Sequence, residues 1–89
     1  MNNVKFDFSD KIILVTGCNG HIGSALCQQL LDAGALVIGM DINSDARQFK
    51  TKLGSFEFLE VDLENNADIV KSCQYLATKY HRLDVLINN

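Results

Sequence analysis

Residues 11–23 read KIILVTGCNGHIG, and the fold class follows from this stretch. Its first part, Lys11 to Thr16, is apolar and β-branched without alternation, which is typical of a strand covered on both faces. Glycines follow at positions 17, 20 and 23, and apolar residues then recur at helical spacing until Gly34, a common stop signal. The stretch therefore predicts a strand, a glycine-rich turn and a helix. The predicted apolar face of that helix carries Ile22, Ala25, Leu26, Leu30 and Ala33.

Further apolar runs repeat this pattern along the chain. Strands are predicted at 36–40, 56–62 and 84–88, with a short helix at 44–53 and a longer one from Ile69 to Tyr80. Strands that alternate with helices form parallel sheets, because a parallel return requires a covering connection. We therefore expect an α/β fold with the order β-α-β-α-β-α-β. Because an apolar strand with an open edge invites aggregation, we also expect residues 1–89 to be the N-terminal part of one larger domain.

The composition narrows the classes of partner. The 89 residues are 47% hydrophobic and 21% charged, which fits a single globular domain with a core. A formal net charge of −3 without a basic cluster argues against nucleic acid and anionic membranes as partners. No apolar run approaches the roughly 20 residues that span a bilayer. The first eight residues do not form the apolar core of a secretory signal, so we expect a cytoplasmic location.

The cysteines give no sign of a disulfide framework or a metal site. Cys18, Cys27 and Cys73 are widely separated, with no C-x-x-C pair and no histidines at metal-ligand spacing. Cys27 and Cys73 fall on the apolar faces of the two longer predicted helices, so we expect both thiols to be buried and inert. His81 is expected to be a polar residue at a helix end.

The glycine-rich turn is the strongest functional signal. Gly17 allows a sharp exit from the strand, Gly20 allows backbone amides to approach a diphosphate, and Gly23 allows the helix to pack closely. The helix N-terminus adds unpaired amides and partial positive charge. The turn therefore predicts a dinucleotide site, with a purely structural turn as the alternative. The candidate contacts are Gly17, Asn19, Gly20, His21, Ile22 and Gly23.

Asp41 follows the second predicted strand, where the adenosine ribose is expected to lie. Its carboxylate can accept hydrogen bonds from both ribose hydroxyls. It also repels a 2′-phosphate, by about 4 kcal/mol at a separation of 4 Å and an effective dielectric constant of 20. No Lys or Arg follows until Arg47. Asp41, with the neighbouring Ile42, therefore predicts NAD rather than NADP, and the alternative is that Asp41 caps a helix or holds a turn.

Taken together, residues 16–23, Asp41, 61–63 and 83–89 resemble the N-terminal half of short-chain dehydrogenases/reductases. The resemblance implies a Rossmann-type doubly wound parallel sheet, of which this chain holds only part. It also implies an NAD-dependent oxidoreductase that transfers hydride between nicotinamide and a small alcohol or carbonyl substrate, and a homo-oligomer by family analogy. In that family, the residue matching Asp62 hydrogen-bonds the adenine and the residue matching Leu63 adds a backbone contact. The pair matching Asn88 and Asn89 stabilises the sheet and lines the cofactor.

Without the resemblance, the residues also fit a purely structural interpretation. Asp62 can be a solvated acid in a turn, and Asn88 and Asn89 can be an ordinary strand end. The glycine spacing TGxxGxxG is that of the extended branch, which often modifies nucleotide sugars, whereas residues 80–89 are similar to the shorter branch. His21 occupies a position where the shorter branch has glycine, and we expect it to be a loop residue near the phosphates. An extended-type epimerase or dehydratase and a nucleotide-binding module without catalysis therefore stay open as alternatives.

Tyr75 and Lys79 match the spacing of the family's catalytic Tyr-x-x-x-Lys. They precede Asn88, on a helix expected to cover the sheet, whereas the family's pair follows the Asn-Asn strand. We therefore expect Tyr75 and Lys79 to have a surface or packing role, no catalytic residue within the 89 residues, and no turnover by this chain.

Overall fold

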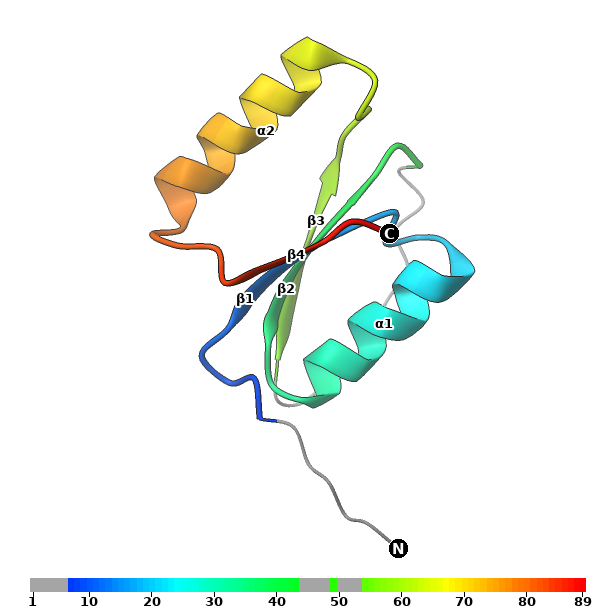
Figure 1. Ribbon diagram of the computed structural model, residues 1–89, viewed down its shortest axis with the longest axis vertical. Coiled ribbons are helices and arrows are strands. Elements are labelled where there is room, and N and C mark those ends of the chain that lie inside the picture. The colour runs from blue at the N-terminus through cyan, green and yellow to red at the C-terminus, as the bar shows by residue number, and fades with distance from the viewer. Residues whose placement is uncertain (1–6, 44–48, 50–53) are drawn as a thin grey trace, which may run out of the picture.

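The described residues form one parallel sheet with a helix on each face (Figure 1). The structure is a computed structural model that describes residues 7–43, 49 and 54–89. The predicted helix at 44–53 falls almost entirely outside these residues. The elements are β1 (Ile12–Thr16), α1 (His21–Asp32), β2 (Leu36–Asp41), β3 (Ser55–Glu60), α2 (Asn66–Lys79) and β4 (Val85–Ile87).

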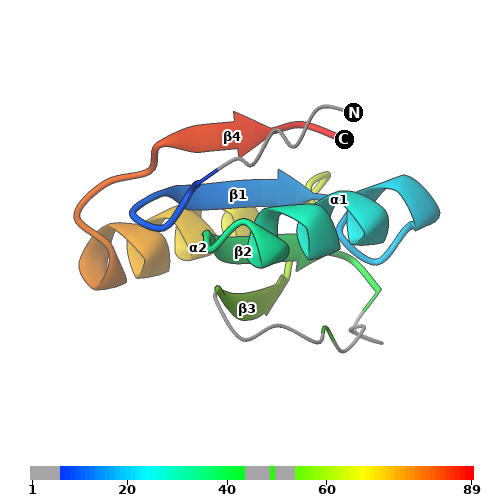
Figure 2. The same cartoon turned by 90° about the horizontal axis from the view of Figure 1, so that it is seen from below.

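The strand order is β3-β2-β1-β4, with every neighbouring pair parallel. The chain moves outward from β1 to β2 and β3, and α2 then carries it back to β4 on the other side of β1. Figure 2 shows the strands in this order with α1 and α2 on opposite faces. This arrangement confirms the predicted α/β, Rossmann-type doubly wound sheet. It also places the reversal of strand order at β1, where such sheets bind ligands beyond the carboxyl ends of their strands.

Alternate residues of β1 supply the two halves of the core. Ile13 and Val15 pack on the α1 side with Cys27, Leu30 and Leu31. On the α2 side, the buried set consists of Leu14, Ile38, Met40 and Val61. Successive strand residues point to opposite faces, so a continuous apolar run is needed when both faces are covered. Residues 11–16 therefore lack a polar and apolar alternation for the expected reason, which is that both faces of the strand are covered.

The buried face of α1 differs from the predicted one. Ile22 is 75% exposed and Ala25 is also exposed, whereas Gly23, Cys27, Leu30 and Leu31 are buried. The reason is steric, because α1 packs closely against the end of β1 and only Gly23, which has no side chain, fits there. Ile22 lies about 100° away around the helix axis and therefore points to solvent. The predicted end of the helix is confirmed, because Gly34 follows it with φ +94°.

The buried position predicted for Cys73 is wrong. Cys73 is exposed, and none of the side chains of α2 is buried. The helix meets the sheet through Leu76 and Tyr80, about one and two turns beyond Cys73, and both are only partly buried. Cys27 is buried as predicted, and burial raises the pKa of its thiol to about 11.

A polar cluster joins α2 to β3. Glu57 of β3 accepts a hydrogen bond from the Lys79 ammonium at 2.9 Å, and the hydroxyls of Tyr75 and Tyr80 also donate to it. Burial raises the pKa of the Glu57 carboxyl, but the hydrogen bonds from Tyr75, Tyr80 and Lys79 outweigh burial and hold the pKa below its usual value. Tyr75 is 40% exposed, so its expected surface position is confirmed. Lys79 also lies at the surface, and its ammonium forms a salt bridge with Glu57.

The turn between β1 and α1 depends on a close backbone approach. Gly17 has φ +65°, a conformation that L side chains rarely adopt. A Cβ added at Gly23 would lie 2.1 Å from the Gly17 carbonyl oxygen and 2.7 Å from Asn89 Nδ2. A Cβ added at Gly20 would meet the Gly17 carbonyl only at 3.5 Å, an ordinary contact. Glycine is therefore required sterically at 23 and not at 20.

Gly23→Ser should destabilise the chain, because its Cβ forces the Gly17 carbonyl to move. We expect a loss of about 1–3 kcal/mol in the free energy of unfolding, the usual cost of overpacking. The matched control Gly20→Ser makes the same chemical change at the N-cap, where serine is well accepted, and should stay within about 0.5 kcal/mol. Urea unfolding followed by circular dichroism measures both. Equal effects of the two substitutions would contradict the steric explanation.

Acid should weaken the contact between α2 and β3. Because the folded-state pKa of Glu57 is lowered, its stabilising contribution is complete above the ordinary carboxyl value of 4.5 and is lost as the pH falls through the folded-state pKa. Between about pH 6 and pH 3, the unfolding free energy of the wild type should therefore fall more steeply than that of Glu57→Gln. Glu60→Gln, at an exposed acid of the same strand, should keep the wild-type dependence. Parallel curves for wild type and Glu57→Gln would show that the cluster does not stabilise the fold.

Candidate functional site

The carboxyl ends of β1, β2 and β4, with the turn after β3, surround a pocket of about 390 Å³. Parallel strands end at the same edge of a sheet, so residues from four separate parts of the sequence meet there. The pocket lies at the reversal of strand order. Its lining residues are Thr16, Gly17, Asp41, Ile42, Val61, Asp62, Leu63, Glu64, Asn88 and Asn89.

The pocket brings together all six predicted contacts outside the glycine turn, and Gly17 of the turn itself. Gly17, Asp41, Ile42, Asp62 and Leu63 line it, as do Asn88 and Asn89. The remaining predicted residues of the turn adjoin Gly17 in sequence but are not part of the lining; they are Asn19, Gly20, His21, Ile22 and Gly23. Among these, Gly20, His21 and Ile22 are exposed at the start of α1, whereas Asn19 and Gly23 are buried. His21 is the first residue of the helix, so the expectation that it lies in a loop is wrong.

Thr16, which sequence reasoning missed, links β1 to the end of β4. Its hydroxyl donates to Asn88 Oδ1 at 3.2 Å and accepts from the Asn89 backbone N–H at 3.1 Å. The Asn89 side chain in turn donates to the Gly17 carbonyl at 3.2 Å. The pattern that could have indicated this role is a hydroxyl residue at the end of a buried strand, directly before the glycine turn. Asn88 and Asn89 are therefore more than an ordinary strand end, because they fix the turn to the sheet.

The first turn of α1 contains no acid that would compensate the positive end of the helix. The N-cap Gly20 has no side-chain cap, and the first turn contains no acidic residue. The first amides of an α-helix lack intrahelical acceptors, and the helix dipole adds about half a positive charge there. The Gly20 N–H bends back to the Gly17 carbonyl at 3.2 Å, which closes the turn. This geometry suits a phosphate or diphosphate.

Asp41 joins the glycine turn to the chain after β2. Its Oδ2 accepts the Asn19 backbone N–H at 2.9 Å, and its Oδ1 accepts the Asn43 N–H at 3.0 Å. Asp41 therefore holds a turn, as one interpretation of the sequence expected. An ionised carboxylate has about four acceptor positions, so each oxygen retains capacity for another donor. The carboxylate is partly exposed and also lines the pocket.

The turn after β3 adds two further acids to the pocket. Asp62 Oδ1 accepts the Glu64 N–H at 2.9 Å, and the Asp62 N–H donates to Asp68 Oδ2 at 3.2 Å. Leu63, between the two acids, is 49% exposed. With Asp41, the pocket therefore holds three acidic side chains, one of which, Glu64, was missed because it belongs to a turn without a distinctive motif. The acids of the pocket thus lie on the β2 and β3 side, and Gly17, at the β1 side, leads into the turn that opens α1.

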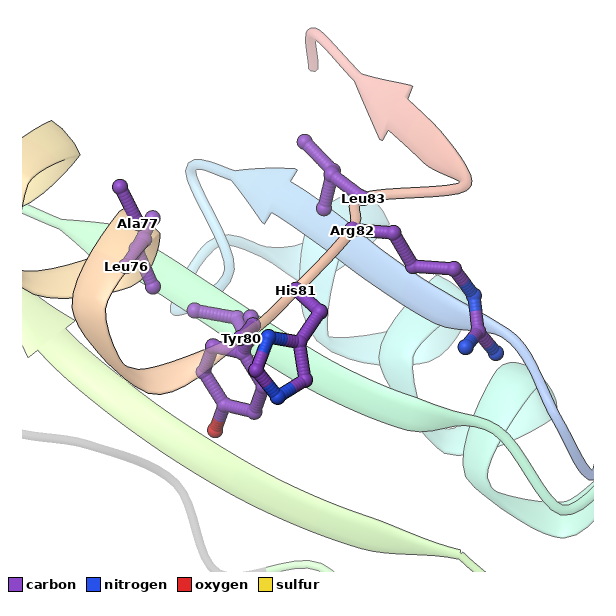
Figure 3. A pocket seen from close by; sticks show the side chains of 7 residues that line it. Leu76, Ala77, Tyr80, His81, Arg82 and Leu83 are labelled. Atoms are coloured by element: carbon purple, nitrogen blue, oxygen red, sulfur yellow. The ribbon is translucent and has the colours of Figure 1, made fainter.

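A second pocket, also of about 390 Å³, lies between β2 and the end of α2 (Figure 3). Arg82 extends away from Leu76, Ala77 and Tyr80, and it pairs with Asp84 at 3.1 Å and donates to the Asp10 carbonyl. His81, expected at a helix end, follows the C-cap Tyr80 and also lines this pocket. None of the predicted cofactor contacts belongs to it, so it is not the candidate site.

The described part of the chain offers neither a cluster of metal ligands nor a helix that could span a membrane. Residues 7–43, 49 and 54–89 contain no group of three or more His, Cys, Asp or Glu side chains placed to hold a metal ion. Within the same part of the chain, neither helix has the length and apolar character needed to cross a membrane.

Comparison with known proteins identifies the family. The family model for short chain dehydrogenases matches residues 11–89. A short chain dehydrogenase/reductase of Colletotrichum higginsianum, dpchG, is 33% identical over 84 residues, which are 89% of this chain and 31% of that protein. The chain therefore spans about a third of the length of that relative.

Two solved structures show the same fold. A short chain dehydrogenase from Leptospira borgpetersenii with bound NAD+ has a TM-score of 0.80 and 33% identity, covering 92% of this chain and 32% of that one. Pseudomonas aeruginosa RhlG in an NADP active-site complex has a TM-score of 0.78 and 30% identity, covering 94% and 36%. Because the family model matches nearly the whole chain, and because the same sheet recurs in these structures, this chain belongs to the short-chain dehydrogenase family.

Proposed function

We propose that this chain binds NAD and supplies the adenosine and diphosphate half of a site for an NAD-dependent oxidoreductase. The reaction of that oxidoreductase is hydride transfer between nicotinamide and an alcohol or carbonyl carbon. One observation carries the proposal: the strand-end pocket places the Asp41 carboxylate beside the glycine turn that opens α1. A diphosphate fits the positive helix end, and a ribose diol fits the free acceptor positions of the acid.

The choice of NAD over NADP rests on this chain's own charges, since similar proteins have been solved with either cofactor. Asp41, Asp62 and Glu64 line the pocket, and none of its described lining residues is basic. A 2′-phosphate beside Asp41 would meet a repulsion of about 4 kcal/mol at 4 Å and an effective dielectric constant of 20. Arg47, the first basic residue after Asp41, lies outside the described residues.

The individual roles follow the family resemblance. Gly17, Asn19, Gly20, His21, Ile22 and Gly23 would surround the diphosphate, and Asp41 with Ile42 the ribose. Asp62 would hydrogen-bond the adenine, Leu63 would add a backbone contact, and Asn88 with Asn89 would line the cofactor next to the sheet. From the resemblance alone, we also propose a small-molecule alcohol or carbonyl substrate, a homo-oligomer and a cytoplasmic location.

We further propose that the 89 residues bind dinucleotide without turnover. Tyr75 and Lys79 have the catalytic spacing, but both contact Glu57 on the surface between α2 and β3. Neither residue lines the strand-end pocket. A phenol and an ammonium already paired with a carboxylate outside the pocket cannot move a proton at a substrate held in it. A nucleotide-binding module without catalysis is therefore the second candidate function for the chain.

Titration of the 89-residue chain with NAD and with NADP, followed by calorimetry, tests the proposal. NAD should bind more tightly than NADP. Asp41→Asn removes the repulsive charge with little change in size, so the ratio of the two dissociation constants should shrink by about tenfold or more, equivalent to about 1.4 kcal/mol. Absorbance at the NADH band should not grow when NAD and simple alcohols are added.

Asp32→Asn is the matched control, because Asp32 is an exposed acid on the last turn of α1, far along the helix from the pocket. It changes the net charge equally and should leave the ratio unchanged. Failure of the wild type to bind either dinucleotide would overturn the proposed function. A ratio that Asp41→Asn does not alter would remove Asp41 from the ribose site.

A further inference from the structure

We propose that Asn19 is a positioning residue for cofactor choice: it holds the Asp41 carboxylate in the orientation that favours NAD over NADP. This inference rests on the proposed function and extends it to a residue that would not itself need to touch the ribose. Asn19 lies in the turn between β1 and α1, in the glycine-rich stretch, and only 9% of it is exposed. A buried amide side chain in a surface turn requires partners, since an unpaired one is costly.

Two donors of Asn19 reach the segment around Asp41, and its side-chain Oδ1 accepts a hydrogen bond from the Cys18 thiol at 3.7 Å. The Asn19 side-chain Nδ2 donates to the Asn43 carbonyl at 2.6 Å, and the Asn19 backbone N–H donates to Asp41 Oδ2 at 2.9 Å. The Asn43 N–H donates to the other carboxylate oxygen at 3.0 Å. The three hydrogen bonds form a closed ring through Asn19, Asp41 and Asn43. One residue of the phosphate-side turn therefore holds the ribose-side acid directly and also through its neighbour.

The ring fixes the rotation of the carboxylate. Each Asp41 oxygen accepts a different backbone amide, so both amides must keep their places for the carboxylate to keep its orientation. The Asn43 amide is kept in place by the bond from the Asn19 side chain to the carbonyl of the same residue. Asn43 is exposed and lies beyond the last register pair of β2 and β3, Asp41 with Glu60, so this bond helps to hold its backbone in place. Loss of the bond would loosen one of the two amides that orient the acid, so the carboxylate would be held less firmly toward a 2′-phosphate.

The consequence is specific to cofactor choice. Repulsion between two charges depends on their separation, so a carboxylate that can turn away discriminates less against NADP. A ribose diol also loses its two aligned acceptors. Loss of the Asn19 amide should therefore weaken NAD binding more than NADP binding. A role limited to the shape of the turn would weaken both cofactors by the same factor, because both carry the same diphosphate.

The test is a double-mutant cycle on the full 89-residue chain, with dissociation constants for NAD and NADP measured by calorimetry. Asn19→Ala should shrink the NADP-to-NAD ratio of dissociation constants by about threefold to tenfold, the range expected for one neutral hydrogen bond. In the Asp41→Asn background, where the discriminating charge is gone, Asn19→Ala should leave the ratio unchanged. Asn19→Ser, a milder change, should act in the same direction.

Gln29→Ala, which removes an amide side chain from the exposed surface of α1, is the matched control and should leave the ratio unchanged. Circular dichroism melting confirms that each variant is folded, and Asn19→Ser replaces Asn19→Ala if the latter is not. Equal weakening of both cofactors, or the same change of ratio with and without the Asp41 charge, would overturn the inference and leave the proposed function standing. A wild-type chain that binds neither dinucleotide would overturn both.

Discussion

The structure depends on one close contact, between Gly23 of α1 and the carbonyl of Gly17 at the end of β1. Only a residue without Cβ allows it, and the contact places the positive end of α1 at the mouth of the strand-end pocket. The same turn is fixed to β4 by Asn89 and to β2 by Asp41. The glycine turn and the Asp41 carboxylate therefore share one rigid support, and the start of α1 could not lie so close to Gly17 and Asn89 if the turn were wider.

The order and direction of the strands could be predicted from the sequence because their signals are local. Apolar runs without alternation indicate strands covered on both faces, and the helix between β1 and β2 forces a parallel return. The orientation of each helix was harder to predict. Ile22 and Gly23 are equally compatible with a helical period, and only the tight packing at β1 selects the glycine as the inward side. Cys73 was misplaced because the contact of α2 with the sheet is confined to the turns around Leu76 and Tyr80.

The candidate site, like the fold, could be predicted from the sequence only in part. Gly17, Asp41, Asp62 and Asn88 could be brought together in advance, since parallel strands end at one edge and each residue follows a strand. The hydrogen bonds of Thr16 and Asn19 could not, because their partners lie 22 or more residues away and depend on the exact register of the strands. Glu64 belongs to a turn whose residues carry no pattern. The polar contacts that hold the site are therefore visible only in three dimensions.

The most direct measurement is an NMR titration of the isotopically labelled chain with NAD, in which each backbone amide is followed separately. If the diphosphate binds at the mouth of α1, the amides of residues 17–23 and of Asp41 should show the largest shift changes, saturating together with one dissociation constant. Amides in the second pocket, such as that of Leu83, should stay nearly constant. Saturating changes confined to residues away from the glycine turn, or no changes at all, would contradict the account.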